Sequence, residues 1–362
     1  MRHDVAIYTP HAAGIYDAAY GSGGGAERQT VLLARALKER GLRIAHIVYP
    51  VVDPVRDAAN PTLVMRPEPR RLATEPAVVW RAMARADACV YVWRTAHASV
   101  GFGAAWTKLR GRRLLYAAAN DSDFTLSSLG GHPTRASLYR FGAAAADALV
   151  VQSAQQVELA NGLFPHHSVT EIPSFVEPAE AASAPAEAFL WAARVVDYKR
   201  PLAFLDLAEA VPEARFRMVA VSNPGDTTPE LEDEIRRRAA ALDNVELFGR
   251  VRHAEVMNLV ERSAGIVNTA TTEGMPNVFL EGWARGIPAL TLQFDPDGRI
   301  EQRGLGVSAR GSWDDFVAGA RELWARREDR GGYGTATREY VEATHGPVAV
   351  GDAWAHVIGG LL

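Results

Sequence analysis

Short apolar runs alternate with longer stretches whose apolar residues recur at helical spacing, and this pattern covers most of the chain. The apolar runs predict buried strands, which in the first half lie near residues 4–9, 43–49, 88–93, 113–118, 147–151 and 168–172. In the second half they lie near residues 188–193, 215–221, 244–248, 264–268 and 288–292. The clearest helix is expected from Ala26 to Arg40, because Gly41 follows it as a stop signal. Strands that alternate with helices are typical of parallel α/β domains.

A break in this pattern divides the chain into two α/β series. The stretch 177–187 is rich in alanine, proline and glutamate and has no periodic apolar face, which is typical of a linker. A chain of 362 residues also exceeds the usual size of one hydrophobic core. We therefore expect a first domain over residues 1–176, a linker over 177–187 and a second domain over 188–346. Residues 347–362 are expected to form a separate last helix after a Gly-Pro pair.

Composition narrows the class of protein. The chain is 48% hydrophobic and 23% charged, as in ordinary soluble globular proteins. Its single cysteine, Cys89, excludes an internal disulfide and a cysteine-based metal cluster. No apolar run approaches the roughly 18 residues that a membrane-spanning helix requires, and the N-terminus has no secretory signal. These features predict a cytoplasmic protein.

Charge adds two observations. The net charge is −4, but the first half carries a basic excess, much of it in the clusters 66–71 and 108–113. Such clusters are either solvated surface or sites that attract anionic lipid headgroups, and both interpretations stay open. Arginine supplies nearly all positive charge, a bias typical of G+C-rich bacterial genomes, and only Lys38, Lys108 and Lys199 are lysines. Because an ammonium and a guanidinium are not equivalent, each remaining lysine is a candidate for a chemical role.

The segment TTEGMPNVFLE, residues 271–281, is the most informative for chemistry. It holds two carboxylates, Glu273 and Glu281, and Pro276 between them predicts the start of a helix, where its missing N–H is not needed. Glu273 then lies in the loop at the carboxyl end of a strand, where open α/β sheets bind ligands. Glu281 lies just over one turn into the helix, whose free N–H groups favour an anion such as a diphosphate.

Two further segments carry candidate chemistry. The run RVVDYK places Arg194 and Lys199 after a predicted strand, and two fixed cations there would stabilise negative charge on a leaving diphosphate. The alternative for this pair is two surface cations near a turn. The run GSGGGAERQ, residues 21–29, precedes the first long helix, and its glycines allow a ligand to approach the backbone closely.

The glycine-rich run also fits the G-x-G-x-x-A fingerprint of dinucleotide-binding proteins, so an oxidoreductase has to be considered. Two observations count against it. The glycines come about a dozen residues after the first strand, whereas the fingerprint requires a tight turn. The second predicted strand also ends without the acidic residue that would bind a ribose.

In this order along the chain, the segments resemble those of the family 4 glycosyltransferases, retaining enzymes with the GT-B fold. The resemblance implies two Rossmann-like domains that face each other across a cleft, the first on the acceptor side and the second on the donor side, with the last helix returning to the first domain. It implies that Glu273 contacts hydroxyls of the donor sugar and acts in catalysis, and that Glu281 holds the ribose hydroxyls. It implies that Arg194 and Lys199 bind the diphosphate and act in catalysis.

The resemblance implies further residues near the donor: Gly23, Gly24, Gly25, Val251, Gly274, Met275, Pro276 and Asn277. The chain departs from the family in one place. Many members carry a histidine after the strand that matches residues 114–118, and this chain has Asn120 and Asp121 there. Asp121 is therefore a catalytic candidate that would contact the sugar or the acceptor. A turn with a purely structural role is the alternative.

The implied function is transfer of a sugar from a nucleotide-diphosphate donor, with UDP-sugar favoured and GDP-mannose second. The acceptor would be a glycan, a lipid-linked molecule or a small molecule, with possible membrane contact through the basic first domain and no nucleic acid as partner. The family needs no metal, so neither metal nor cofactor is expected. Two other functions stay open, a GT-B sugar-nucleotide epimerase and a non-catalytic sugar-nucleotide-binding partner of another transferase.

Overall fold

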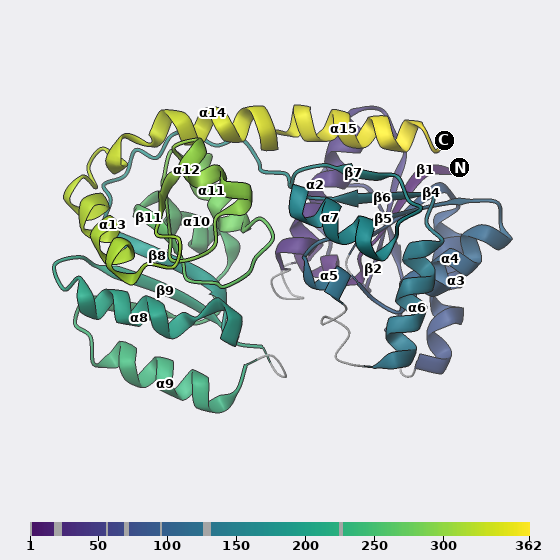
Figure 1. Ribbon diagram of the computed structural model, residues 1–362. Coiled ribbons are helices and arrows are strands. Elements are labelled where there is room, and N and C mark those ends of the chain that lie inside the picture. Colours follow the sequence, from purple (N-terminus) through teal and green to yellow (C-terminus); the bar gives the residue numbers. More distant parts are fainter. Residues whose placement is uncertain are drawn as a thin grey trace. The chain divides into compact units, whose positions relative to one another are not determined.

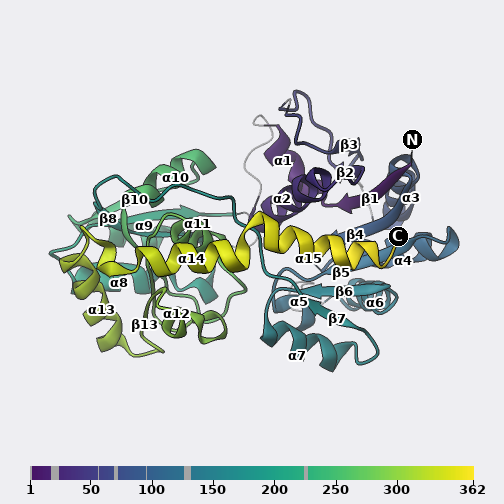
Figure 2. The same ribbon diagram turned by 90° about the horizontal axis from the view of Figure 1, so that it is seen from above.

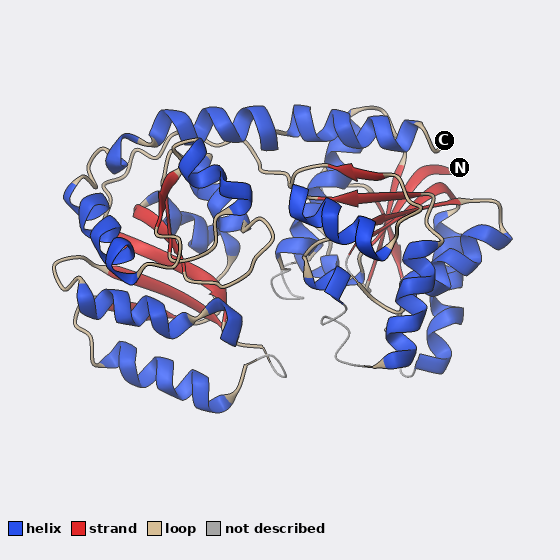
Figure 3. Cartoon of the chain, viewed as in Figure 1, coloured by secondary structure: helices blue, strands red, loops and turns tan. Residues whose placement is uncertain are grey.

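The computed structural model describes residues 2–17, 24–55, 57–68, 72–94, 96–125, 132–223 and 227–362. The chain forms two compact units. Unit 1 comprises Met1–Phe175 together with Pro347–Leu362, and unit 2 comprises Val176–Gly346. Each unit is a parallel sheet with helices on both faces, as Figures 1 and 3 show. This is the GT-B type of architecture, with two Rossmann-like units, that the sequence predicts.

Unit 1 contains a seven-stranded sheet in the order β3-β2-β1-β4-β5-β6-β7. Its strands are β1 (His3–Tyr8), β2 (Ile44–Val48), β3 (Thr62–Met65), β4 (Ala88–Arg94), β5 (Arg113–Ala117), β6 (Ala148–Val151) and β7 (Val169–Glu171). Its helices are α1 (Ala13–Tyr16), α2 (Gly25–Glu39), α3 (Glu75–Ala86), α4 (Ser99–Leu109), α5 (Ser122–Thr125), α6 (Pro133–Ala144), α7 (Ala154–Leu163) and α15 (Pro347–Gly359). The strand order reverses between β1 and β4, which makes the carboxyl ends of these two strands the switch point of the sheet.

The alternation of side chains along a strand gives unit 1 a core on each face of its sheet. Tyr91 and Trp93 of β4 pack into one core, whereas Val90 and Val92 pack into the other. The second core also takes in apolar residues of α2 and α15, which lie against each other in Figure 2. The last helix therefore completes unit 1, as the sequence predicts.

Unit 2 contains a six-stranded sheet in the order β10-β9-β8-β11-β12-β13. Its strands are β8 (Ala188–Arg194), β9 (Phe216–Val221), β10 (Val245–Phe248), β11 (Ser263–Asn268), β12 (Ala289–Thr291) and β13 (Gly306–Ser308). Its helices are α8 (Pro201–Ala210), α9 (Pro229–Ala240), α10 (His253–Glu261), α11 (Asn277–Trp283), α12 (Arg299–Gln302), α13 (Trp313–Ala325) and α14 (Gly334–His345). The order reverses between β8 and β11, so the carboxyl ends of these strands form the second switch point.

Residues 177–187, expected to form a linker, belong to unit 2 and are hydrogen-bonded to it. The N–H of Ala182 donates to the carbonyl oxygen of Arg285 at 2.8 Å. The guanidinium of Arg330 donates to the carbonyl oxygens of Ala182 and Ala184 at 3.2 and 2.8 Å. A backbone carbonyl and the side chain of Arg330 thus satisfy backbone groups of a segment that has no apolar periodicity of its own.

All eleven strands that the apolar runs predict are present. The first and the last residue of each strand lie within one residue of the predicted positions. Two short strands, β3 and β13, do not stand out in the sequence. Both lie at an edge of their sheet, and only one residue of β3 and none of β13 is buried. The edge strands β7 and β10 bury no residue and are nevertheless predicted, so the degree of burial alone does not explain why β3 and β13 escape the prediction.

Candidate functional site

The loops that leave β8 and β11 meet at the switch point of unit 2. The N–H of Thr271, in the loop after β11, donates to the carbonyl oxygen of Tyr198 at 2.9 Å. The hydroxyl of Thr269 donates to the carbonyl oxygen of Lys199 at 2.7 Å. Each loop therefore fixes the path of the other.

Lys199 and Glu273 are brought into direct contact by these loops. Lys199 ends a short 3-10 turn after β8, and its ammonium Nζ forms an ion pair with the carboxylate of Glu273. The two side chains are 13% and 10% exposed, so the pair is largely withdrawn from water. Burial and the nearby guanidinium of Arg194 lower the pKa of Lys199, whereas the carboxylate of Glu273 favours its charged form.

Arg194 is the last residue of β8 and is exposed at the same edge of the sheet. Its Nη2 donates to the hydroxyl of Tyr198 at 3.3 Å, and the ammonium of Lys199 lies 5.5 Å from the centre of the Tyr198 ring. Tyr198 thus lies between the two cations. Arg194 and Lys199 are close enough to repel each other, which lowers the pKa of Lys199. A doubly charged anion that contacts both cations would relieve this repulsion and would therefore be stabilised.

Glu281 lies one turn into α11 and is buried. One of its carboxylate oxygens accepts a hydrogen bond from Nε2 of His253 at 2.7 Å. His253 is the first residue of α10, and its side chain is 41% exposed. The sequence gives no sign of this contact, because the two residues lie on separate helices and a histidine that opens a helix has no particular spacing to a glutamate elsewhere.

The remaining donor-side candidates of unit 2 lie around these groups. Gly274 and Met275 follow Glu273 in the loop, Pro276 is the N-cap residue of α11, and Asn277 is the first residue of that helix. Met275 is partly buried against the core of unit 2. Val251 lies between β10 and α10 and is also partly buried against this core.

In unit 1, the glycine-rich run is described only in part. Gly23 lies outside the described residues, whereas Gly24 is the N-cap residue of α2 and Gly25 is its first residue. Both are exposed. A Cβ on Gly24 would lie 2.7 Å from the carboxylate of Glu27, so the side chain of Glu27 folds back over this glycine.

Asp121 is buried at the start of α5. Its Oδ1 accepts a hydrogen bond from Nε2 of Gln156 at 3.0 Å, and its carbonyl oxygen accepts the N–H of Phe124. The preceding Asn120 accepts the N–H of Ser122 through its side chain at 3.1 Å, which is an Asx turn. Asp121 is therefore held by the fold of unit 1 at the carboxyl end of β5.

Across the described part of the chain, no three histidine, cysteine, aspartate or glutamate side chains gather as metal ligands. Asp295 and Asp297, which are spaced as in an Asp-x-Asp motif, have other partners. Asp295 accepts the N–H of Ile300 at 2.8 Å, and Asp297 forms an ion pair with Arg299 at 3.0 Å.

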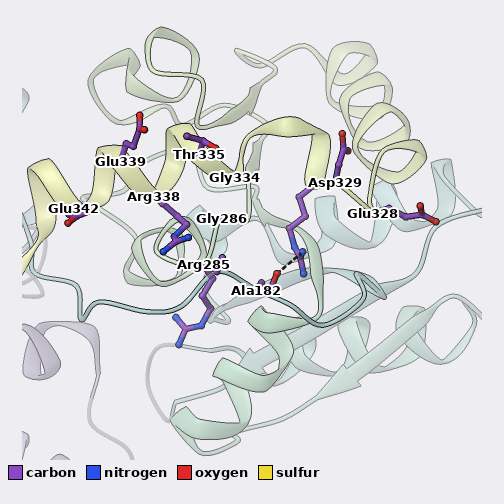
Figure 4. Close-up of a pocket in the computed structure, with 12 residues that line it drawn as sticks. Ala182, Arg285, Gly286, Glu328, Asp329, Gly334, Thr335, Arg338, Glu339 and Glu342 are labelled. Carbon is purple, nitrogen blue, oxygen red and sulfur yellow. Dashed lines mark hydrogen bonds between the residues drawn. The ribbon is translucent and has the colours of Figure 1, made fainter.

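A hollow of about 450 Å³ lies elsewhere on unit 2 (Figure 4). It is not lined by the donor-site candidates Arg194, Lys199, Glu273 and Glu281. Its floor is the turn at Gly286, towards which Arg338 extends from α14, while Glu339 points away. A Cβ on Gly286 would lie 3.7 Å from Cδ of Arg338, so this part of the hollow is narrow. Most of its wall is formed by long, charged surface side chains.

Comparison with known proteins gives the family of unit 2. Residues 186–326 match the family described as Glycosyl transferases group 1. Unit 2 is a group 1 glycosyltransferase domain. No curated protein matches the chain in sequence.

Solved structures match both units. Sucrose-phosphate synthase from Thermosynechococcus elongatus has a TM-score of 0.76 and 14% identity, with 99% of each chain covered. HepE from Anabaena, solved with UDP-glucose, has a TM-score of 0.68 and 11% identity, with 99% of this chain and 100% of that chain covered. The lipopolysaccharide outer core galactosyltransferase WaaB has a TM-score of 0.64 and 14% identity at the same coverage. At these identities the likeness establishes the GT-B fold.

The surface of unit 1 differs from expectation in one of its two basic clusters. Arg66, expected at the surface, is only 2% exposed, and residues 69–71 lie outside the described residues. In the second cluster, Arg112 and Arg113 form ion pairs with Asp87 and Asp147 at 2.9 and 2.8 Å. Among the helices of the described residues, none is both long and apolar enough to cross a membrane.

Proposed function

We propose that the protein is a retaining, metal-independent glycosyltransferase that uses a nucleotide-diphosphate sugar as donor. The observation that carries the proposal is the arrangement at the switch point of unit 2. Two cations, Arg194 and Lys199, lie there, and the ammonium of Lys199 is paired with the largely buried carboxylate of Glu273. The match of this unit to the group 1 glycosyltransferases supports the same reading.

The cations would act on the leaving group. When the bond between the anomeric carbon and the diphosphate breaks, negative charge grows on the diphosphate oxygen. A preorganised cation in a site with little water stabilises this charge more than it stabilises the bound donor. Lys199 meets this requirement because its ammonium is largely buried and is held by Glu273 before any donor arrives.

Glu273 has two roles in this proposal. In the free protein its carboxylate neutralises Lys199. When the donor is bound, the ammonium turns to the diphosphate, and the carboxylate accepts hydrogen bonds from hydroxyls of the donor sugar. In the free protein the two side chains neutralise each other, and with the donor bound each has a partner on the donor. Neither charge is therefore left buried and unpaired in either state.

Glu281 would bind the two ribose hydroxyls of the nucleotide. One of its oxygens is engaged by His253, so the carboxylate has a fixed orientation. A carboxylate accepts two or more hydrogen bonds at each oxygen, so this contact is compatible with ribose binding.

Retention of configuration would follow from attack on the same face that the diphosphate leaves. The acceptor hydroxyl oxygen forms a bond to the anomeric carbon, the bond from that carbon to the diphosphate oxygen breaks, and the proton of the hydroxyl moves to the diphosphate. The departing diphosphate itself acts as the base, so neither an enzyme nucleophile nor a metal is required.

UDP-sugar is the donor we favour, and GDP-mannose is the second choice. HepE, which shares the fold over its full length, was solved with UDP, with UDP and glucose, and with UDP-glucose. The acceptor is a glycan, a lipid-linked molecule or a small molecule, and the reaction would take place in the cytoplasm. Each part of this assignment is open to direct measurement.

The experiment that tests the proposed function uses radiolabelled UDP-glucose and GDP-mannose, first alone and then with acceptor extracts. Transfer of label to an acceptor only when extract is present supports a glycosyltransferase. Release of a modified sugar from donor alone would instead identify an epimerase. Donor binding with no conversion under either condition would identify a non-catalytic binding protein.

A further inference from the structure

Arg94 is the last residue of β4, at the switch point of unit 1. In the register of the sheet, Trp93 lies opposite Tyr8, the last residue of β1, and Arg94 lies opposite Ala117, the last residue of β5. This is the edge at which open parallel sheets bind ligands. The position in unit 1 corresponds to the edge of unit 2 that carries Arg194 and Lys199.

The guanidinium of Arg94 is buried and has no partner among the described residues of the chain. The residue is 7% exposed, and its Nε has neither a hydrogen bond nor contact with solvent. Among the residues that the structure describes, none forms a hydrogen bond or an ion pair with this guanidinium. Buried charged groups in proteins are normally paired, so an unpaired one at a ligand-binding edge needs an explanation.

The acidic groups around Arg94 do not supply that partner. Asp123 has the strongest electrostatic effect on Arg94 of the acidic groups. Its carboxylate, however, already accepts the N–H groups of Ala96 and Ala119 and the hydroxyl of Tyr116. Glu27, in the first turn of α2, acts on Arg94 more weakly. Burial lowers the pKa of Arg94 to about 10, so the group stays charged at neutral pH.

Arg66 is a second buried arginine of unit 1, and its guanidinium is held by neighbouring residues of the same unit. It follows β3 at the same edge of the sheet and is 2% exposed. Its Nη1 donates to the hydroxyl of Tyr8 at 2.5 Å, and its Nε donates to the carbonyl oxygen of Pro67 at 3.1 Å, whereas its Nη2 has no hydrogen-bond partner among the described residues. The guanidinium also lies 5.2 Å from the centre of the Tyr49 ring. Arg94 has no counterpart to any of these contacts.

We propose that unit 1 binds an acceptor that carries a phosphate group, and that Arg94 holds this phosphate. The inference rests on the proposed glycosyltransferase function, in which unit 2 supplies the residues for the donor and unit 1 receives the acceptor. A guanidinium binds a phosphate through two parallel hydrogen bonds, which would satisfy the donors that the fold leaves open. The phosphate could belong to a soluble sugar phosphate or to a phospholipid headgroup.

The first measurement is the thermal unfolding of Arg94→Met without ligand, with Arg66→Met as the matched control. Methionine has a similar length and no charge, so removing an unpaired buried charge should leave the melting temperature unchanged or raise it. Arg66→Met should lower it, because Tyr8 loses its partner. A fall for Arg94→Met as large as that for Arg66→Met would show that Arg94 serves the fold, and the proposal would be overturned.

The second measurement is the affinity for inorganic phosphate and for glucose 6-phosphate at saturating UDP, which occupies the cations of unit 2. We expect wild type to bind both, Arg94→Met to bind at least tenfold more weakly, and Arg94→Lys to fall between them. No phosphate binding by wild type would overturn the proposal. Glucose without phosphate is the negative control.

UDP binding separates this inference from the proposed function. Arg94→Met should bind UDP as wild type does. Weaker UDP binding by this variant would place Arg94 in the donor site and overturn the assignment to the acceptor. Failure of UDP to bind even the wild-type protein would count against the proposed function and not against the phosphate site.

Flotation with vesicles distinguishes the two sources of the phosphate. Vesicles of phosphatidylcholine with and without one fifth phosphatidylinositol are compared, using wild type and Arg94→Met. Binding that requires phosphatidylinositol and Arg94 identifies a lipid acceptor. Binding of glucose 6-phosphate without such flotation identifies a soluble sugar phosphate.

Discussion

The ammonium of Lys199 contacts the carboxylate of Glu273, although the first residue follows β8 and the second follows β11. The contact depends on the strand order of unit 2, because β8 and β11 are neighbours in the sheet and far apart in the sequence. A buried cation and a buried anion stabilise each other in the free protein. A donor would have to exchange this contact for its own diphosphate and sugar hydroxyls, and the predictions below follow from that exchange.

Glu281→Gln should weaken binding of UDP, whereas Glu273→Gln should mainly weaken binding of the intact UDP-sugar. The reason is the placement of the two carboxylates, one on α11 for the ribose and one in the loop for the sugar. Loss of one charge-assisted hydrogen bond should cost about 1.5–3 kcal/mol in each case. Calorimetry with both ligands on both variants measures the difference. Equal UDP affinity of wild type and Glu281→Gln would contradict the assignment of Glu281.

Lys199→Ala should lower kcat by roughly a hundredfold or more, the range for loss of one preorganised charge stabiliser. The KM for the donor should change much less, because the cation interacts most strongly with the departing diphosphate. Lys199→Arg should recover only part of the rate, since a guanidinium places its charge differently. Steady-state kinetics of the three proteins provide the test. A raised KM with an unchanged kcat would show that Lys199 only binds the donor.

UDP affinity should fall with rising pH, and the fall should begin below the ordinary range of a lysine. Burial and Arg194 lower the pKa of Lys199, so the ammonium loses its proton, and with it its attraction for the diphosphate, as the pH rises through that value. Titration calorimetry over about pH 6 to 10 covers the interval up to the usual lysine pKa. Lys199→Arg is the control, because its guanidinium keeps its charge over this interval. A fall of the same size in Lys199→Arg would assign the effect to another group.

Turnover should persist in the presence of EDTA. In the proposed mechanism, Arg194 and Lys199 stabilise the charge that a divalent metal stabilises in metal-dependent transferases. The measurement is the initial rate of sugar transfer after dialysis against the chelator, with manganese and magnesium added back to separate samples. Loss of activity with EDTA that either metal restores would refute this part of the proposal.

Gly142→Ala should destabilise unit 1, because α4 and α6 cross where two glycines meet. A Cβ on Gly142 would lie 2.5 Å from the backbone nitrogen of Gly101, and one on Gly101 would lie 2.4 Å from the carbonyl oxygen of Leu138. Backbone atoms cannot move aside as a flexible side chain can, so the helices must separate, at about 1–3 kcal/mol or more.

Gly162→Ala is the matched control for this substitution. Gly162 lies in α7 with no atom within 4 Å of the added Cβ, so alanine should raise the free energy of unfolding by about 0.5–1 kcal/mol. Chemical denaturation of the two variants measures both changes. Equal effects of the two substitutions would contradict the packing of α4 against α6.

The strands of both sheets could be predicted because parallel strands buried on both faces are continuous apolar runs. This reasoning does not cover the edge strands, because β3 and β13 escape the prediction whereas β7 and β10, which bury no residue, are predicted. The order of strands in the sheet decides which loops lie next to each other, and the periodicity of apolar residues does not reveal this order. The sequence therefore yields Lys199 and Glu273 as separate candidates but not their contact.

The roles of His253 and Arg94 could not be predicted from the sequence either. His253 opens a helix like many other residues, and only the packing of α10 against α11 brings it to Glu281. Arg94 is hidden for a different reason. In the sequence it is one of many arginines. What distinguishes it is that no described residue forms a hydrogen bond or an ion pair with its guanidinium, which is visible only in the structure.

The two ends of the chain belong to the same unit, since α15 packs its buried residues Val350, Trp354 and Ile358 into the core beside Leu33 and Leu37 of α2. Unit 2 is continuous in sequence, whereas unit 1 is assembled from the first 175 residues and the last 16. A fragment that stops at Phe175 would expose the apolar face of α2 to water. A circular permutant that joins Leu362 to Met1 through a short linker and opens the chain between Phe175 and Val176 would make both units continuous. In such a chain each unit could be expressed, labelled and titrated with its own ligand separately.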